Sequence, residues 1–128
     1  MPRRWRPERN RSNAENTNTF PAWLLAADQT MSSIGNRLLA VRSRIENSAK
    51  QCGREPSTIT LLAVSKTRTV EEIHAAVNCG QRHFGENYLQ DAQPKIDAFR
   101  GTDLIWHFIG PVQSNKTRSV ARDFNWVH

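Results

Sequence analysis

Residues 59–67 read ITLLAVSKT, a nearly unbroken apolar run that ends in serine, lysine and threonine. Such a run is typical of a strand buried on both faces, as in a parallel sheet that helices cover on each side. A helix pattern follows directly, because Thr69 and Glu72 have the spacing of a capping box, in which each side chain bonds to the other residue's backbone. We therefore predict a buried strand over residues 59–64 and a helix that begins after Thr69 and stops at Gly80.

The alternation of strand and helix patterns continues to the end of the chain. Further strands are predicted at residues 82–84, 104–109 and 124–127, and further helices at residues 86–100 and 113–123. Regular alternation of this kind indicates a parallel sheet with right-handed crossover connections. Two architectures have this order of elements, an open doubly wound sheet and a (β/α)8 barrel. Both bind ligands at the carboxyl ends of the strands.

Another helix is predicted ahead of the first strand, after a region of different composition. Its apolar residues recur every three or four positions, as on the buried side of an amphipathic helix: Ile34, Leu38, Val41, Ile45 and Ala49. Residues 1–30 lack such a pattern and carry five arginines between positions 3 and 11. We expect residues 1–30 to be a disordered or non-native extension and residues 31–128 to form a partial barrel domain, with Met31 as an alternative start.

Composition and charge narrow the class of protein. The 128 residues are 38% hydrophobic and 23% charged, and they contain no apolar run long enough to cross a membrane. A complete barrel needs about 250 residues, so the chain holds at most part of one. The two cysteines show no disulfide or metal-site spacing, which favours a reducing, cytoplasmic location. The net charge of +6 leaves nucleic-acid binding by the arginine-rich start as an alternative.

Polar side chains occur at the carboxyl end of each of the first three predicted strands: Lys66, Asn87 and His107. Because side chains alternate along a strand, Lys66 shares a face with Val64 and Leu62. If that face points into a barrel, the amine tops a hydrophobic column, and partial desolvation lowers its pKa. A neutral amine can attack a carbonyl group and hold it as a Schiff base.

Each of these residues also has a purely structural interpretation, and spacing alone does not choose between the two. Lys66 can be a solvated lysine at the start of a loop. Asn87 can hydrogen-bond a ring substituent, with Glu86 to orient it, or both residues can cap the next helix. His107 can stack on an aromatic ligand or fill a layer of the sheet.

Taken together, three motifs resemble the pyridoxal phosphate homeostasis protein family, whose members are related to the N-terminal domain of alanine racemase. The motifs are LLAVSKT at 61–67, FGENY at 84–88 and WHFIG at 106–110, which QSNK follows at 113–116. The resemblance runs from Met31 to His128. It implies the N-terminal half of a (β/α)8 barrel (TIM barrel) of the kind found in fold-type III pyridoxal phosphate proteins, preceded by a helix.

The resemblance also implies a cofactor and a role. Lys66 matches the lysine that holds pyridoxal 5′-phosphate (PLP) as a Schiff base, and Asn87 matches the asparagine beside the cofactor; His107 is a third cofactor-binding candidate. The family has no settled catalytic activity and keeps PLP and other B6 vitamers in balance, with PLP-requiring apo-enzymes as candidate partners. We therefore expect a non-catalytic, cytoplasmic PLP carrier, with an amino-acid racemase-like enzyme as the alternative.

Two departures from the family pattern affect these expectations. Arg68 stands where many relatives have a second lysine, and arginine keeps the charge but cannot form a Schiff base. The chain also ends near the predicted fourth strand, so no residue can be matched to a phosphate site, which barrels of this kind commonly build after strands seven and eight. We expect residues 31–128 alone to bind PLP weakly and to self-associate through exposed strand edges.

Overall fold

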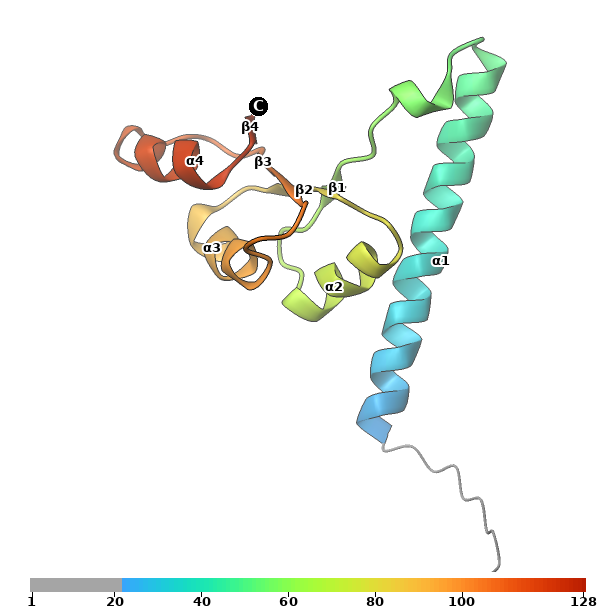
Figure 1. Ribbon diagram of the computed structural model, residues 1–128, viewed down its shortest axis with the longest axis horizontal. Coiled ribbons are helices and arrows are strands. Elements are labelled where there is room, and N and C mark those ends of the chain that lie inside the picture. Colours follow the sequence, from blue (N-terminus) through green and yellow to red (C-terminus); the bar gives the residue numbers. More distant parts are fainter. Residues whose placement is uncertain (1–21) are drawn as a thin grey trace, which may run out of the picture.

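The computed structural model describes the backbone from residue 22 and the side chains from residue 33 to the end of the chain. Residues 1–21, and with them most of the predicted extension, lie outside the described residues. Strands and helices alternate as predicted (Figure 1) in this order: α1 (Ala22–Gln51), the 3₁₀ turn η1 (Pro56–Thr58), β1 (Ala63–Val64), α2 (Val70–Asn78), β2 (His83–Glu86), α3 (Leu89–Ala98), β3 (Ile105–Phe108), the 3₁₀ turn η2 (Ser114–Lys116), α4 (Thr117–Asp123) and β4 (Trp126–Val127).

The four strands form one parallel sheet, as predicted, with the strand order β1-β2-β3-β4. Ala63 of β1 lies opposite Phe84 of β2, which in turn lies opposite Trp106 of β3. Each strand is added on the same side of the previous one, without the reversal of order that defines a doubly wound sheet. Connections of one hand then place the helices on one face of the sheet, and Figure 1 shows α2 and α3 on the same side of the strands.

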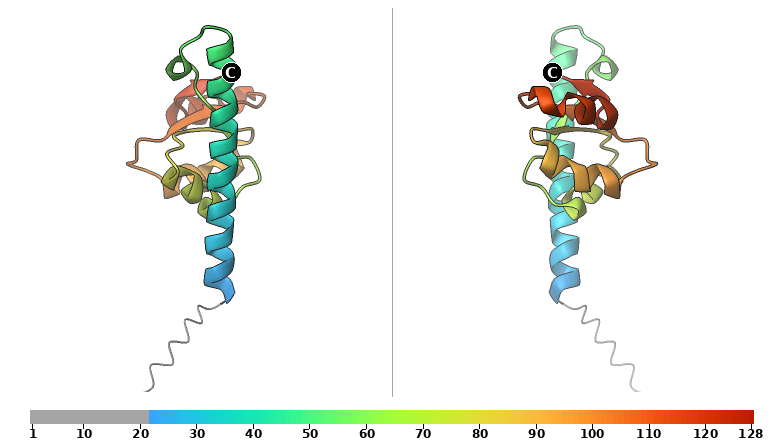
Figure 2. Two further views of the ribbon diagram at one scale, coloured as in Figure 1. Left: turned by 90° about the vertical axis from the view of Figure 1, so that its right-hand side faces the viewer. Right: turned by 90° about the vertical axis from the view of Figure 1, so that its left-hand side faces the viewer.

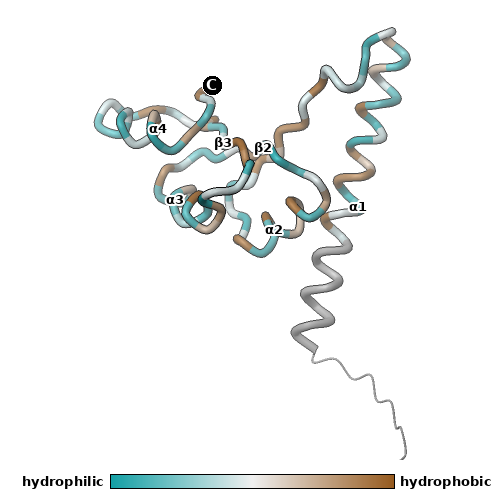
Figure 3. Tube along the Cα trace, in the orientation of Figure 1, coloured by the Kyte–Doolittle hydropathy of each residue, from teal (hydrophilic) through white to brown (hydrophobic). Residues whose placement is uncertain are grey.

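The core lies between that face of the sheet and the helices. Phe84, Trp106 and Phe108 of the two central strands pack with Ile73 of α2 and Val120 of α4, and each of the five is at most 5% exposed. The rings of Phe84 and Trp106 lie 5.6 Å apart between centroids. In Figure 3 hydrophobic stretches of the trace lie at the centre of the fold, near the strands, and recur on turns of α1 and α2. Burying each large apolar side chain stabilises the fold by about 1.5–3 kcal/mol.

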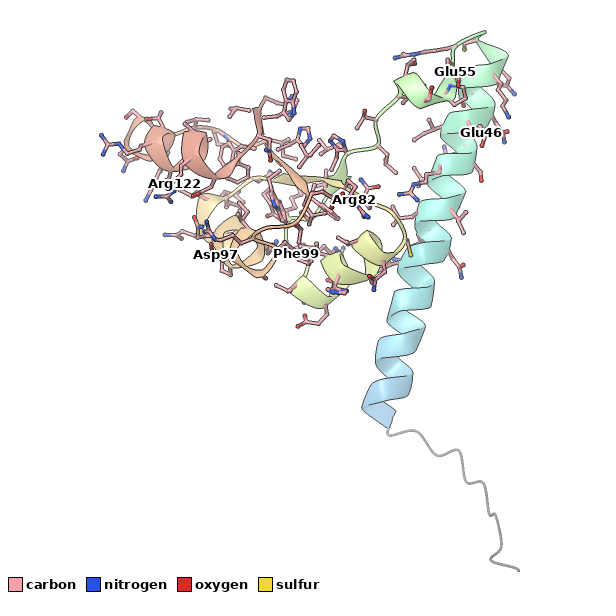
Figure 4. The ribbon with its side chains drawn as sticks, in the orientation of Figure 1. Glu46, Glu55, Arg82, Asp97, Phe99 and Arg122 are labelled. Atoms are coloured by element: carbon pink, nitrogen blue, oxygen red, sulfur yellow. The ribbon has the colours of Figure 1, made fainter. Side chains whose placement is uncertain are left out.

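Polar side chains fasten the amino ends of the strands. Arg82, labelled in Figure 4, precedes β2; its guanidinium donates to the carbonyl of Val77 (2.9 Å) and pairs with Asp103 (3.1 Å) ahead of β3. Gln81 is buried, and its amide nitrogen donates to the carbonyl of Leu61 (2.7 Å). Buried backbone carbonyls need such donors because an unpaired polar group in the interior is costly.

The first strand is shorter and less buried than predicted. β1 contains only Ala63 and Val64, and residues 59–62 lie outside the regular strand. Val64 is 48% exposed. The prediction of a strand buried on both faces is therefore wrong, because β1 lies at the edge of the sheet and, within the described chain, helices cover only one of its faces.

The first helix is longer than the sequence indicates. α1 begins at Ala22 rather than near Met31, so residues 22–30 are helical in the structure. It packs against α2 (Figure 2), where Arg42 donates to the carbonyl of Cys79 (2.7 Å). Gly53 follows the helix with a φ of 65°, a conformation that glycine adopts readily because it has no Cβ. Although α1 is long, neither it nor any other described helix contains an apolar segment suited to crossing a membrane.

The capping box of α2 is confirmed and yields a stability prediction. The Thr69 hydroxyl accepts from the amide of Glu72 (3.2 Å), and the Glu72 carboxylate accepts from the amide of Thr69 (2.9 Å). Thr69→Ala removes the first bond, so we expect the free energy of unfolding in urea to fall by about 1 kcal/mol. Thr60→Ala, at an exposed residue outside the helices and strands, is the control. Equal losses in the two variants would show that the cap does not stabilise the fold.

Candidate functional site

The candidate site lies at the carboxyl ends of β1 and β2. Lys66 follows β1 after one intervening residue, and Asn87 follows β2 directly. The carboxyl ends of parallel strands meet at one edge of a sheet, which is where such folds bind ligands. The Lys66 side chain is exposed and takes no part in the ion pairs of the described chain.

Lys66 is exposed in the described chain. The sequence predicts a desolvated amine only if this face points into a barrel, and here Val64 on the same face is 48% exposed, which agrees with the alternative of a solvated lysine at the start of a loop. The physical reason is that no described residue covers this face of β1, opposite the helices. The amine is therefore accessible from solvent, beside an open surface.

The backbone turns sharply directly after Lys66. The amide of Arg68 donates to the carbonyl of Ser65 (3.0 Å), and Thr67 has a φ of 64°. A β-branched residue is rare in this left-handed region, and holding a residue in such a sparsely populated conformation costs about 1–3 kcal/mol. Strain of this kind is typical of functional sites, where the surrounding structure enforces it.

Beneath the site lies a fully buried ion pair. Glu86, the last residue of β2, is 0% exposed, and its Oε1 accepts from Lys95 Nζ (2.8 Å) and from Ser65 Oγ (2.6 Å). Lys95 Nζ also donates to the carbonyl of Ser65 (2.8 Å). The network joins the ends of β1 and β2 to α3. It therefore fixes the backbone next to Lys66 and next to Asn87.

This network is not predicted from the sequence, where Glu86 is a candidate to orient Asn87 or to cap a helix. In the structure Glu86 instead binds Lys95 and Ser65, and the N-cap of α3 is Tyr88, whose side chain forms no cap hydrogen bond. A usable signal was present, because Lys95 falls on the inward side of α3 together with Ala92 and Ile96. A lysine on a buried helical stripe needs an internal carboxylate partner.

Asn87 has an unusual environment for a polar side chain. Its Oδ1 is buried and has no hydrogen-bond partner within the described chain. Its backbone carbonyl lies so close to Gly110, after β3, that a Cβ built on Gly110 would come within 2.1 Å of the oxygen. A crevice of about 270 Å³ opens beside Asn87, and Gln113 and Lys116 also line it. Neither Lys66 nor His107 reaches this crevice.

His107 is buried in the sheet and already engaged by neighbouring rings. Its Nε2 lies 3.0 Å from His83 Nδ1, and its Nδ1 lies 3.0 Å from His128 Nε2. Trp126 stacks on the same ring, with an interplanar angle of 11°. Burial lowers the pKa of His107 below its ordinary value of 6.5, and repulsion from a protonated His83 or His128 lowers it further. Among the described residues, no hydrogen bond joins Lys66, Asn87 and His107 to one another.

The sequence matches proteins of known name. No protein-family model matches the chain. It is 52% identical over 101 residues to the pyridoxal phosphate homeostasis protein of Escherichia coli (strain K12), covering 77% of this chain and 43% of that protein. The proteins of the same name from Pseudomonas aeruginosa and Vibrio cholerae are 49% and 50% identical, with the same coverage. The chain thus spans less than half the length of these curated relatives.

Two solved structures are also similar to the chain. PipY of Synechococcus elongatus PCC7942, solved with PLP bound, is 39% identical with a TM-score of 0.61, over 74% of this chain and 41% of that one. The crystal structure of an unknown protein from Bifidobacterium adolescentis is 30% identical in sequence with a TM-score of 0.72, over 79% of this chain and 46% of that one. The α/β fold with a parallel sheet is therefore shared with these structures.

The buried ion pair gives a second stability prediction. Lys95→Met leaves the Glu86 carboxylate buried without its cationic partner, so the free energy of unfolding falls by about 3–5 kcal/mol. Lys50→Met is the matched control, because Lys50 pairs with Glu46 on the exposed surface of α1, and its unfolding midpoint in urea stays unchanged. A loss in Lys95→Met no larger than in the control would contradict a structural role for the pair.

The depressed pKa of His107 predicts how stability depends on pH. Near pH 6 the unfolded chain binds more protons at this residue than the folded chain, so stability falls as the pH drops below about 6.5. Urea unfolding at pH 7.5 and pH 5.5 measures the loss. We expect His107→Gln to reduce the pH dependence and His74→Gln, on the exposed side of α2, to preserve it. An unchanged dependence in His107→Gln would refute the assignment.

Proposed function

Over 77% of its length the chain is homologous to pyridoxal phosphate homeostasis proteins, and we propose that it binds PLP through Lys66 and takes part in vitamin B6 homeostasis. The observation that carries the proposal is the similarity to a PLP-bound structure together with an accessible lysine at the carboxyl end of a strand. When bound, the cofactor supplies an aldehyde, with which a lysine amine condenses to a Schiff base.

Lys66 is the best candidate among the four lysines of the chain. Lys50 is paired with Glu46 on α1, and Lys95 is buried against Glu86. Lys116 lies in η2 after β3 and is half-buried, where it lines the crevice beside Asn87. Only Lys66 combines exposure with a position at the edge of the sheet where ligands bind. The turn at Thr67 supports this role, because it changes the chain direction directly after the lysine.

Asn87 and His107 have supporting roles in the proposal. The unpartnered Oδ1 of Asn87 can accept a hydrogen bond once a ligand or a small rearrangement brings it a donor, so Asn87 seats the cofactor ring. His107 contributes the face of its ring rather than a nitrogen, since both nitrogens already contact other histidines. The described residues offer no group that we assign to the phosphate.

We further propose that residues 31–128 form the first half of a (β/α)8 barrel. The unreversed strand order and the helices on one face are what a barrel requires. The relatives are more than twice as long as the matched region. In a closed barrel the open face that carries Val64 becomes the interior, where the sequence pattern had placed it.

The carrier role is preferred to catalysis. Racemisation needs acid and base groups on opposite faces of the cofactor; Lys66 supplies one, and the only tyrosine, Tyr88, is 61% exposed at the start of α3. We place the protein in the cytoplasm, with B6 vitamers and PLP-requiring apo-enzymes as partners. The arginine-rich start that prompted the nucleic-acid alternative lies outside the described residues.

Borohydride trapping tests the proposal. PLP is added to the chain, the imine is reduced, and the modified lysine is located by peptide mapping. We expect the label on Lys66, loss of most of it in Lys66→Arg, and no change in Lys50→Arg. Equal labelling of Lys50, Lys66 and Lys116 would mean non-specific amine chemistry and would sink the proposal. Racemisation of alanine by the unlabelled protein would favour the enzyme instead.

A further inference from the structure

Three histidines that are distant in sequence form a row across one face of the sheet. His83 begins β2, His107 lies in β3, and His128 follows β4. The ring contacts measure 3.0 Å between His83 Nδ1 and His107 Nε2, and 3.0 Å between His107 Nδ1 and His128 Nε2. Ring centroids lie 5.2 Å and 5.3 Å apart. The row lies on the face opposite the helices, because His107 alternates with the core residues Trp106 and Phe108.

The two contacts use opposite sides of the central ring, and this restricts what the row can do. One metal ion cannot bind Nδ1 and Nε2 of the same imidazole, so the row is not a three-histidine metal site. A short nitrogen–nitrogen contact between imidazoles is instead a hydrogen bond, in which one nitrogen carries the proton and the other accepts it. With all rings neutral, His107 must donate on one side and accept on the other.

We propose that His83, His107 and His128 form a proton relay in which the tautomers of the three rings are locked together. If His107 Nε2–H donates to His83, then His128 Nε2–H donates to His107, and all three rings carry their proton on Nε2. If the direction reverses, all three carry it on Nδ1. No mixed neutral arrangement satisfies both contacts.

Proton transfer along the row balances without any further reactant. A proton binds Nδ1 of His128, which is exposed in the described chain, and the Nε2 proton of His128 passes to Nδ1 of His107. The Nε2 proton of His107 then passes to Nδ1 of His83, and His83 releases its own Nε2 proton. One proton enters and one leaves, and the row changes from the Nε2–H to the Nδ1–H arrangement. Halfway, His107 is an imidazolium that donates to both neighbours.

The charged side chains of the neighbouring strands and helices are paired elsewhere or point away from the row. The carboxylate of Glu86 on β2 points to the opposite face, where it binds Lys95. Asp103, ahead of β3, pairs with Arg82. β4 carries no ionisable side chain, and β1 carries none before the lysine that follows it. Helices α2, α3 and α4 pack on the other face. On the α1 side, Arg42 and Glu46 line the same crevice as His83, and Glu46 pairs with Lys50.

The relay runs from the amino end of the sheet to the carboxyl end. His83 is the first residue of β2, whereas His128 lies past the end of β4. The carboxyl edge is the one that carries Lys66, so the row connects the far edge of the sheet to the edge with the candidate site. The relay itself does not depend on PLP, because it is built only from residues of the chain.

Nuclear magnetic resonance of the full chain with ¹⁵N-labelled histidine, recorded without PLP above pH 7, tests the relay. Two-bond ¹⁵N–¹H spectra identify the protonated nitrogen of each ring. We expect His83, His107 and His128 to share one tautomer, with nitrogen–nitrogen couplings through both hydrogen bonds. His74, which contacts Asn78 instead, is the internal control without such a coupling. Opposite tautomers within the row, or no coupling at either contact, would overturn the proposal.

Two phenylalanine variants distinguish a proton relay from a role of the histidine rings in packing alone. His107→Phe keeps a ring in the sheet but removes both contacts, so the tautomers of His83 and His128 become independent. His83→Phe removes only one contact, so the coupling between His107 and His128 remains, which keeps the test decisive if His107→Phe does not fold. Loss of that coupling in His83→Phe would refute the pairwise geometry. The resonance experiments contain no PLP, so their outcome does not depend on whether Lys66 binds the cofactor. The relay and the proposed function can therefore be refuted independently.

Discussion

The buried pair of Glu86 and Lys95 is the constraint on which the rest of the candidate site depends. A charge in the interior must find its partner, and here one carboxylate oxygen accepts from both Lys95 and Ser65. These three residues come from α3, β2 and the end of β1, so the pairing sets how the three elements meet. The two candidate cofactor-binding residues at strand ends, Lys66 and Asn87, each follow a member of this network in the chain. The network of Glu86, Lys95 and Ser65 therefore fixes the backbone positions of both residues, although neither of their side chains takes part in it.

Local signals in the sequence predicted most of the fold. The capping box at Thr69 and Glu72 depends on residues three apart, and the order of strands and helices depends on short apolar runs, so both were readable without knowledge of distant contacts. Features that depend on residues distant in the sequence could not be predicted in this way. The exposure of Val64 and Lys66 depends on what covers one face of the sheet, and no local pattern contains that information. The first helix is also longer than its apolar stripe predicts. A helix can extend beyond the residues that pack against the rest of the fold, and the stripe marks only those residues.

The candidate site shows the same division. Lys66 and Asn87 could be identified from their positions at strand ends, and the structure places them at one edge. The row of histidines could not be identified, because His107 lies 24 residues from His83 and 21 from His128, and only the strand register brings the rings together. The sheet thus has two different faces. One is closed by helices and holds the apolar core together with the Glu86–Lys95 pair, and the other is open, with imidazole rings and an accessible amine.

The close approach of Asn87 and Gly110 has a mechanical consequence. A Cβ on Gly110 would lie 2.1 Å from the Asn87 carbonyl oxygen. The loops after β2 and β3 are therefore in direct backbone contact there, with no side chain between them. A displacement of one loop toward the other is resisted at once by the repulsion of main-chain atoms. The carboxyl edge of the sheet therefore resists movement in that direction, and a force on one loop is passed to the other.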